Sequence, residues 1–268
     1  MTSQDAPLVD VHAHVWGPDM PYAADAWTRV GYAFPVEDYL ALLDQHGIEY
    51  GVIAAASLFG TYSDYTLEAL RAHKRLRGTV IVENTVDFAT LKAMHEAGVV
   101  GVRLQWFNID PLPDLRTANW RTLLVRLREL DMHVHVNIEG GRLPLVAAPI
   151  VESGVKLVID HFGWSDARLD PTGLGHRTAI RYAQQGKAWI KLSSGHHFSD
   201  PQVPIDLAAR FLSDVGTDRL FWGSDAPFVG MEDKVTYGQT VRAFTDWVPD
   251  PAQRNAIGET AHRFYFDR

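Results

Sequence analysis

The chain has 268 residues, of which 46% are hydrophobic and 22% are charged, and its formal net charge at pH 7 is −8. This composition is typical of a globular protein with one large core. The acidic balance argues against nucleic acid or an anionic membrane as a partner, since both bind basic faces. The absence of cysteine excludes disulfides, thiolate metal sites and a cysteine nucleophile. We therefore expect a small-molecule partner.

The first residues, MTSQDAP, have neither the basic region nor the apolar core of a signal peptide. No apolar run reaches membrane-spanning length. We therefore expect a cytoplasmic protein. A homo-oligomer is compatible with the sequence, although nothing in it requires one.

Short apolar runs alternate with amphipathic segments along the chain. The runs predict strands at 8–14, 50–56, 78–84, 99–105, 132–138, 155–161, 188–194 and 219–225. Helical spacing and capping residues predict helices at 36–47, 64–76, 87–98, 119–130, 142–153, 177–185, 202–213, 236–247 and 251–265. Such alternation favours a parallel α/β sheet closed into a (β/α)8 TIM barrel, with a doubly wound sheet as the weaker alternative. No linker divides the chain, so we expect one domain over 1–268.

The first predicted strand ends in His12-Ala13-His14. Side chains two residues apart lie on one face of a strand, so the two imidazoles should converge. Converging imidazoles suit metal binding or proton transfer. The alternative is a pair of buried histidines bonded to nearby carbonyl groups.

The segment 15–35 follows, and it is too long to be a plain connector. Aromatic residues stand between its prolines and glycines, namely Trp16, Tyr22, Trp27, Tyr32 and Phe34. These rings predict a lid or wall over a site, with Trp27 as a candidate substrate contact, or else they simply cap the barrel by packing.

Polar side chains stand at the ends of later strands, where a barrel of this kind builds its active site. They are Arg103, Gln105, Asn137, Glu139, Asp160, His161, Ser193, Ser194, His196, His197 and Asp225. Because unpaired buried charge is costly, such a cluster indicates a site. Arg103 needs an anion, which is either a substrate carboxylate or a neighbour such as Glu139.

Other members of this set have alternative roles. Asp225 precedes Pro227, where aspartate is often a turn cap, but beside the two histidines of the first strand we favour catalysis. His161 is a ligand, an acid, a hydrogen-bond donor or a packed core residue. A histidine of the fifth strand, His133 or His135, could reach a metal, or both could belong to the core. The helical histidines are expected at the surface, namely His46, His73, His95 and His262.

In their order and spacing, VDVHAHVWGP, GVVGVRL, IDHFGWSD and LFWGSDAPF resemble the amidohydrolase superfamily. The likeness is greatest to the amidohydrolase-related branch, which contains 2-pyrone-4,6-dicarboxylate lactonase and sulfomuconolactone hydrolases. GETAHRFY resembles the closing helix of that branch, so the resemblance covers nearly the whole chain. It implies an amidohydrolase-like barrel and a place in the catabolism of aromatic compounds.

The resemblance also implies roles for residues. His12, His14, His161 and Asp225 fall in the reaction centre, and Arg103 falls where the dicarboxylate lactonase has an arginine for a substrate carboxylate. The chain departs from that pattern where it has Asn137 in place of a tyrosine, and where it shows Trp106-Phe107-Asn108 and His196-His197 without the further arginines. Asn137 and His197 are therefore candidate substrate contacts of this chain.

The expected cofactor is one divalent metal ion, zinc or manganese, held by His12, His14 and Asp225, and metal-independent action is left open. Binuclear members of the superfamily use a carboxylated lysine on strand four, where this chain has Arg103. The first functional hypothesis is a hydrolase of a small carboxylate-bearing lactone with Asp225 as general base. The second is a non-oxidative decarboxylase, and the third is a non-catalytic binding barrel.

Overall fold

The computed structural model describes residues 7–267. Eight parallel strands form one sheet in the order in which they occur in the chain. They are β1 (Val9–Ala13), β2 (Tyr50–Ile53), β3 (Leu76–Val80), β4 (Val99–Gln105), β5 (His133–Asn137), β6 (Leu157–Ile159), β7 (Ala188–Leu192) and β8 (Leu220–Trp222). The predicted (β/α)8 barrel is therefore confirmed.

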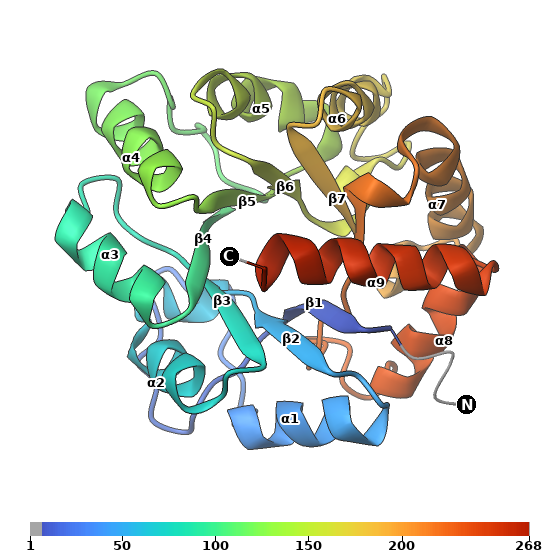
Figure 1. Ribbon diagram of the computed structural model, residues 1–268, viewed down its shortest axis with the longest axis horizontal. Helices are drawn as coiled ribbons and strands as arrows, with labels where there is room; N and C mark the ends of the chain where they lie inside the picture. Colours follow the sequence, from blue (N-terminus) through green and yellow to red (C-terminus); the bar gives the residue numbers. More distant parts are fainter. Residues whose placement is uncertain (1–6, 268) are drawn as a thin grey trace.

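Nine α-helices pack on the ring of strands within residues 7–267, eight around it and α9 across one end (Figure 1). They are α1 (Val36–Gln45), α2 (Asp64–Ala72), α3 (Phe88–Glu96), α4 (Ala118–Glu129), α5 (Leu143–Glu152), α6 (Leu174–Gln184), α7 (Gln202–Val215), α8 (Tyr237–Trp247) and α9 (Pro251–Tyr265). Within residues 7–267, the structure contains no helix that is both long and apolar enough to cross a membrane.

Local sequence explains where these helices lie and begin. In α1 the buried residues Val36, Tyr39 and Leu43 recur at helical spacing, which turns one face toward the sheet. Thr236 and Gln239 form a reciprocal capping box at the start of α8. In α9 the Asp250 side chain accepts a hydrogen bond from the backbone of the first turn, and proline occupies the first helical position.

Several predicted boundaries are wrong, since the strands expected at 50–56, 155–161 and 219–225 are shorter in the structure, and two further cases have a clear physical reason. The helix expected at 64–76 ends at Ala72, because Leu76 is a fully buried residue of β3. The strand expected at 78–84 is β3, which ends at Val80, and the next two apolar residues, Ile81 and Val82, line a cavity instead. The apolar run therefore continues past the residue at which the strand ends.

The start of α6 also differs from the expected 177. The helix begins at Leu174 because the Asp170 carboxylate accepts hydrogen bonds from the backbone N–H groups of Gly175 and His176, at 3.2 and 2.8 Å. A side chain that satisfies first-turn donors lets a helix begin earlier than its apolar pattern suggests.

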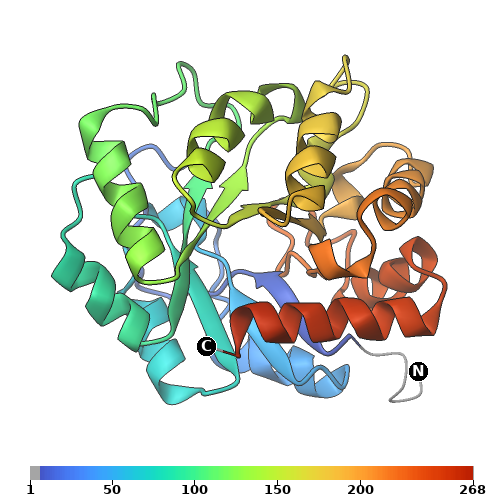
Figure 2. The same cartoon turned by 45° about the horizontal axis from the view of Figure 1, so that its top comes forward.

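Helix α9 closes one end of the barrel. Figures 1 and 2 show it crossing that end of the ring of strands. Its Phe264 and Tyr265 belong to a buried apolar cluster with Val11, Trp189 and Phe221 from the strands. The base of the barrel is therefore filled, and the opposite end, where the strands finish, is the end that can receive a ligand.

The barrel closes between its first and last strands through backbone hydrogen bonds. The Asp225 N–H donates to the His12 carbonyl at 2.7 Å, and the His14 N–H donates to the Ala226 carbonyl at 2.8 Å. The pairing of β1 with β2 shifts register between Asp10 and Ala13. An irregularity of this kind can re-aim side chains, and here the Asp10 carboxylate accepts a hydrogen bond from Tyr237 of helix α8, whereas His12 contacts the rings of His135 in β5 and of His161, which follows β6.

Candidate active site

The two histidines of β1 meet the carboxylate that follows β8. Asp225 Oδ1 lies 3.5 Å from His12 Nε2 and 3.4 Å from His14 Nε2. The two imidazole rings are 5.0 Å apart between centroids. The predicted convergence of the pair is confirmed, and the backbone bonds that close the barrel place Asp225 opposite both rings.

The turn after β8 is capped by a serine, which leaves the neighbouring carboxylate free for the site. Ser224 Oγ accepts a hydrogen bond from the Ala226 N–H at 3.1 Å and donates to Asp10 Oδ2 at 2.6 Å. The capping role considered for Asp225 is therefore carried by Ser224.

The hydrogen bonds of His14 make this group of atoms suitable for a cation. His14 Nδ1 lies 2.8 Å from the Ala54 carbonyl, which can only accept, so Nδ1 donates and Nε2 is the ring nitrogen that can bind a cation. That nitrogen faces a carboxylate oxygen of Asp225. Within residues 7–267, His12 Nε2 is buried and has no hydrogen-bond partner. The ligand atoms of His12, His14 and Asp225 all lie within 4.8 Å of one another. Two imidazole nitrogens and one carboxylate oxygen in this arrangement fit a divalent metal ion.

His161 is connected to the same carboxylate through Ser194. Its Nδ1 lies 2.9 Å from Ser193 Oγ and 2.8 Å from Ser194 Oγ, and Ser194 Oγ donates to Asp225 Oδ2 at 2.5 Å. His161, Ser194 and Asp225 have φ values of 53°, 57° and 68°. Left-handed backbone is uncommon for residues other than glycine and often occurs at functional sites.

Burial and neighbouring charges set the protonation of these groups. Burial lowers the pKa of His161 to about 4, although Asp160 and Asp225 oppose this shift. Burial favours the neutral form of Asp225, but His161, His14 and His12 together hold its pKa well below the usual range. At neutral pH the site therefore combines an ionised carboxylate with a neutral His161.

A network of buried charges lies directly beneath. Asp160 is fully buried, and its carboxylate is 3.3 Å from Arg103, 3.5 Å from Lys191 and 3.4 Å from His12 Nδ1, and it also contacts His135 Nε2. Burial opposes ionisation of Asp160, but these neighbours, with His135 first, hold its pKa well below the usual range. Two cations therefore share one ionised carboxylate.

Lys191 is the member of this network that the strand-end pattern missed. The side chain is only 1% exposed, and Nζ lies 3.1 Å from the Val11 carbonyl, 3.0 Å from His135 Nε2 and 3.3 Å from His12 Nδ1. Burial lowers its pKa to about 8, against the opposing effect of Asp160. A lone lysine in the apolar run AWIKLSS carried the same signal that identified Arg103.

Arg103 has an internal partner that differs from the expected Glu139. It donates to the Ala55 carbonyl at 2.7 Å and to Asp160 Oδ2 at 3.3 Å. Glu139 instead pairs with Arg142 and accepts from the backbone of Asn108. The Arg103 side chain also lines the cavity described next, so an internal pair and a ligand contact are compatible.

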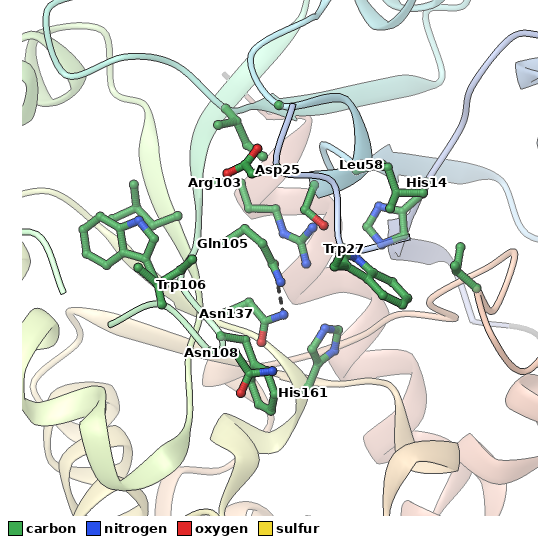
Figure 3. Close-up of a pocket in the computed structure, with 18 of the residues that line it drawn as sticks. His14, Asp25, Trp27, Leu58, Arg103, Gln105, Trp106, Asn108, Asn137 and His161 are labelled. Carbon is green, nitrogen blue, oxygen red and sulfur yellow. Dashed lines mark hydrogen bonds between the residues drawn. The ribbon is translucent and has the colours of Figure 1, made fainter. Parts of the chain in front are cut away.

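A cavity of about 950 Å³ opens above these groups. Figure 3 shows Arg103, Gln105 and Asn137 between Trp106 on one side and His14 and Trp27 on the other. The cavity also contacts the predicted residues His161, His197 and Asp225. All predicted site residues except His12 therefore line the same cavity. His12 is fully buried and lies against Asp225, which lines the cavity.

The remaining candidates differ in how firmly they are held. Asn137 donates to Gln105 Oε1 at 3.0 Å and accepts from Trp164 Nε1 at 2.7 Å, so its amide is fixed. Trp27 is 66% exposed at the cavity, whereas Trp16 is buried against other rings of the same segment. The 15–35 segment therefore packs on the barrel and also forms part of the cavity wall. His197 Nε2 lies 3.8 Å from Asp225 Oδ2.

The other histidines separate into two groups. His135 belongs to the charge network, whereas His133 packs against Phe264 and Tyr265 at the closed end of the barrel. The helical histidines expected at the surface are partly exposed and do not line the cavity, namely His46, His73, His95 and His262.

Comparison with known proteins agrees with this architecture. The family model described as amidohydrolase matches residues 9–266, and the chain belongs to the amidohydrolase family. It is 30% identical over 257 residues to 4-sulfomuconolactone hydrolase of Rhizobium radiobacter, an alignment that covers 92% of this chain and 86% of the relative.

Two solved structures share the fold over almost their whole length. A probable 2-pyrone-4,6-dicarboxylic acid hydrolase from Acinetobacter baumannii, solved with citric acid bound, is 26% identical with a TM-score of 0.91, over 97% of this chain and 99% of that chain. A Pseudomonas putida protein described as a hydrolase of the same acid is 33% identical with a TM-score of 0.88, over 97% of each chain.

Proposed function

We propose that this chain hydrolyses a small lactone that carries a carboxylate, with Asp225 as the general base. The observation that carries the proposal is an ionised, partly buried Asp225 at the floor of a cavity, with Oδ1 within 3.5 Å of two imidazole nitrogens. The names of the relatives as lactone hydrolases support this reaction class.

In the proposed reaction, the oxygen of a water molecule attacks the lactone carbonyl while Asp225 accepts a proton from that water. The tetrahedral intermediate then collapses, and the bond between the former carbonyl carbon and the ring oxygen breaks. The proton that Asp225 accepted passes to the leaving ring oxygen. His161 Nδ1 contacts both Ser193 Oγ and Ser194 Oγ, and in the tautomer whose Nδ1 accepts a hydrogen bond from Ser193, Nε2 carries the proton and can donate to the oxyanion.

His12, His14 and Asp225 are the residues that would hold a metal ion. Asp160 Oδ1, 3.4 Å from His12 Nδ1, can accept the ring proton and so leave Nε2 free as a ligand. Nitrogen and oxygen donors suit zinc or manganese. When bound, such an ion polarises the carbonyl and lowers the pKa of the attacking water.

We expect at most one tightly bound divalent ion per chain. Binuclear members of the superfamily use a carboxylated lysine on strand four, whereas β4 of this chain has Arg103, which is paired with Asp160. Elemental analysis after extensive dialysis measures the content, and His14→Ala, which removes one proposed ligand, should lower any content found. Two equivalents per chain after removal of adventitious ions would contradict this expectation.

We expect Arg103→Met to weaken catalysis selectively on acidic substrates, because Arg103 faces the cavity and retains unused guanidinium donors. Loss of such a charge contact costs roughly 2 to 5 kcal/mol, or about 30- to 5,000-fold in kcat/KM. The measurement compares a carboxylate lactone with its methyl ester on one enzyme preparation. An equal loss on both substrates would assign Arg103 to structure alone.

The function itself is tested by screening a panel of carboxylate-bearing and neutral lactones for acid release in a pH-stat. Incubation with hydroxybenzoates and assay of released CO2 tests the decarboxylase alternative on the same protein. Acid release that requires Asp225 supports the proposal. Release of CO2 without lactone hydrolysis refutes it, and binding of lactones without turnover would indicate a non-catalytic barrel.

A further inference from the structure

The cavity extends across the whole mouth of the barrel. At one side it contacts His14 and Asp225, which lie at the seam of β1 and β8. At the other side it contacts the segments that follow β3 and β4, including Val82 and Trp106. In a closed ring of eight strands in chain order, β3 and β4 lie opposite β7 and β8. Much of the cavity is therefore distant from the reacting groups.

The cavity wall that follows β4 is aromatic and apolar, and it reaches the reacting groups through Trp164, whose ring centroid lies 5.4 Å from that of His161. Trp106 packs edge-on against Trp120 with ring centroids 5.4 Å apart, and Phe107 packs against Trp164 at 5.3 Å. All four rings line the cavity, and Trp106 is only 8% exposed. Figure 3 shows Trp106 on the side of the cavity away from His14, with Arg103 and Gln105 between them. Rings held by other rings form a preorganised surface for a flat or apolar group.

Charges around the cavity disfavour a second acidic group at this wall. Outside the reaction centre, the charged side chains of residues 7–267 that line the cavity are Asp25, Glu83, Arg103 and Arg168. Arg103 is the buried cation among them, whereas Arg168 is exposed and Asp25 and Glu83 are exposed and acidic. A second anion would therefore meet two exposed carboxylates. The exposed arginine would bind it only weakly, because solvent and salt screen the attraction between exposed charges.

We propose that the substrate is a monocarboxylate lactone with an aryl or bulky alkyl substituent, which packs against Trp106 and Phe107 while the carbonyl lies at Asp225. This inference rests on the proposed lactone hydrolysis and specifies its substrate class. A volume of about 950 Å³ lies near the upper end of ordinary ligand pockets, which suits a molecule larger than a bare lactone ring.

The test uses three matched lactone carboxylates that differ in one substituent on a ring carbon away from the carbonyl: hydrogen, phenyl or carboxymethyl. We expect kcat/KM for the phenyl compound to exceed that for the hydrogen compound by at least tenfold, mainly through KM. The carboxymethyl compound should be no better than the hydrogen compound.

Two wall variants assign the preference to residues. Phe107→Ala, at a partly exposed position, and Trp106→Ala, at a buried one, should each lower the phenyl-to-hydrogen ratio at least fivefold. Because the ratio is measured on one preparation, it does not depend on the fraction of folded enzyme. Phe88→Ala removes an exposed ring of α3 that does not line the cavity, so its ratio should equal that of the parent.

The possible outcomes distinguish failure of this inference about the substrate from failure of the proposed lactone hydrolysis. If none of the three lactones releases acid, the proposed function fails. If acid is released but the phenyl compound is no better than the hydrogen compound, or the carboxymethyl compound is best, only the inference fails. A phenyl preference that survives in both wall variants would also overturn it, because the substituent would then bind elsewhere.

Discussion

Asp225→Asn should lower kcat by about 10²- to 10⁴-fold and leave the thermal melt close to that of the parent. An amide at this position cannot accept the proton of the attacking water, whereas the fold at this turn depends on Ser224 and on backbone hydrogen bonds. The measurement is the rate of acid release at saturating substrate, together with a melt of the same preparation.

A matched control for this change is Asp206→Asn, which makes the same substitution at an exposed position of α7. It should behave like the parent enzyme in both measurements. Turnover of Asp225→Asn within about tenfold of the parent would show that the carboxylate is not the base.

The second large effect concerns stability, and we expect it from Asp160→Asn. Removing this carboxylate leaves Arg103 and Lys191 buried without an anion in contact, because Asp160 is the carboxylate that both approach. Breaking a buried ion pair in this way typically costs about 3–5 kcal/mol in the free energy of unfolding. For a protein of this size, that corresponds to roughly 6–20 °C in Tm.

A double variant separates charge imbalance from lost packing. In Asp160→Asn combined with Lys191→Met, one unpaired cation disappears together with the anion, so part of the lost stability should return. Urea unfolding of the parent, both single variants and the double variant closes the cycle. Strictly additive losses, or a loss below about 1 kcal/mol for Asp160→Asn, would contradict a network that depends on this carboxylate.

The fold was accessible from the sequence because each element has a periodic apolar pattern, and α1 and α9 show how spacing and caps define helices. The pattern fails where apolar residues serve a cavity. Ile81 and Val82 continue the apolar run of β3, yet they line the cavity after the strand has ended. An apolar pattern in the sequence indicates that residues are buried. It does not distinguish residues buried in a sheet from residues that line a cavity.

The site was accessible in part for a related reason. His12, His14 and Asp225 could be chosen because they end strands, and ends of parallel strands meet at one face. Their partners depend on which side chains cross the barrel interior, which the order of residues does not specify. The Asp160 partner of Arg103 and the place of Lys191 beside His12 arise from contacts between strands that are distant in sequence.

The seam between β1 and β8 has a consequence for how the enzyme matures. Ser224 and Asp10, which hold the two sides of this seam together, are 214 residues apart in the chain. Contacts of such long range form late, since loop closure must precede them. A nascent chain that has not yet produced β8 already contains both imidazoles of His12 and His14 but lacks Asp225. Under the proposed mechanism, catalysis should begin only when the ring has closed, so that completion of the barrel and activation would be one event.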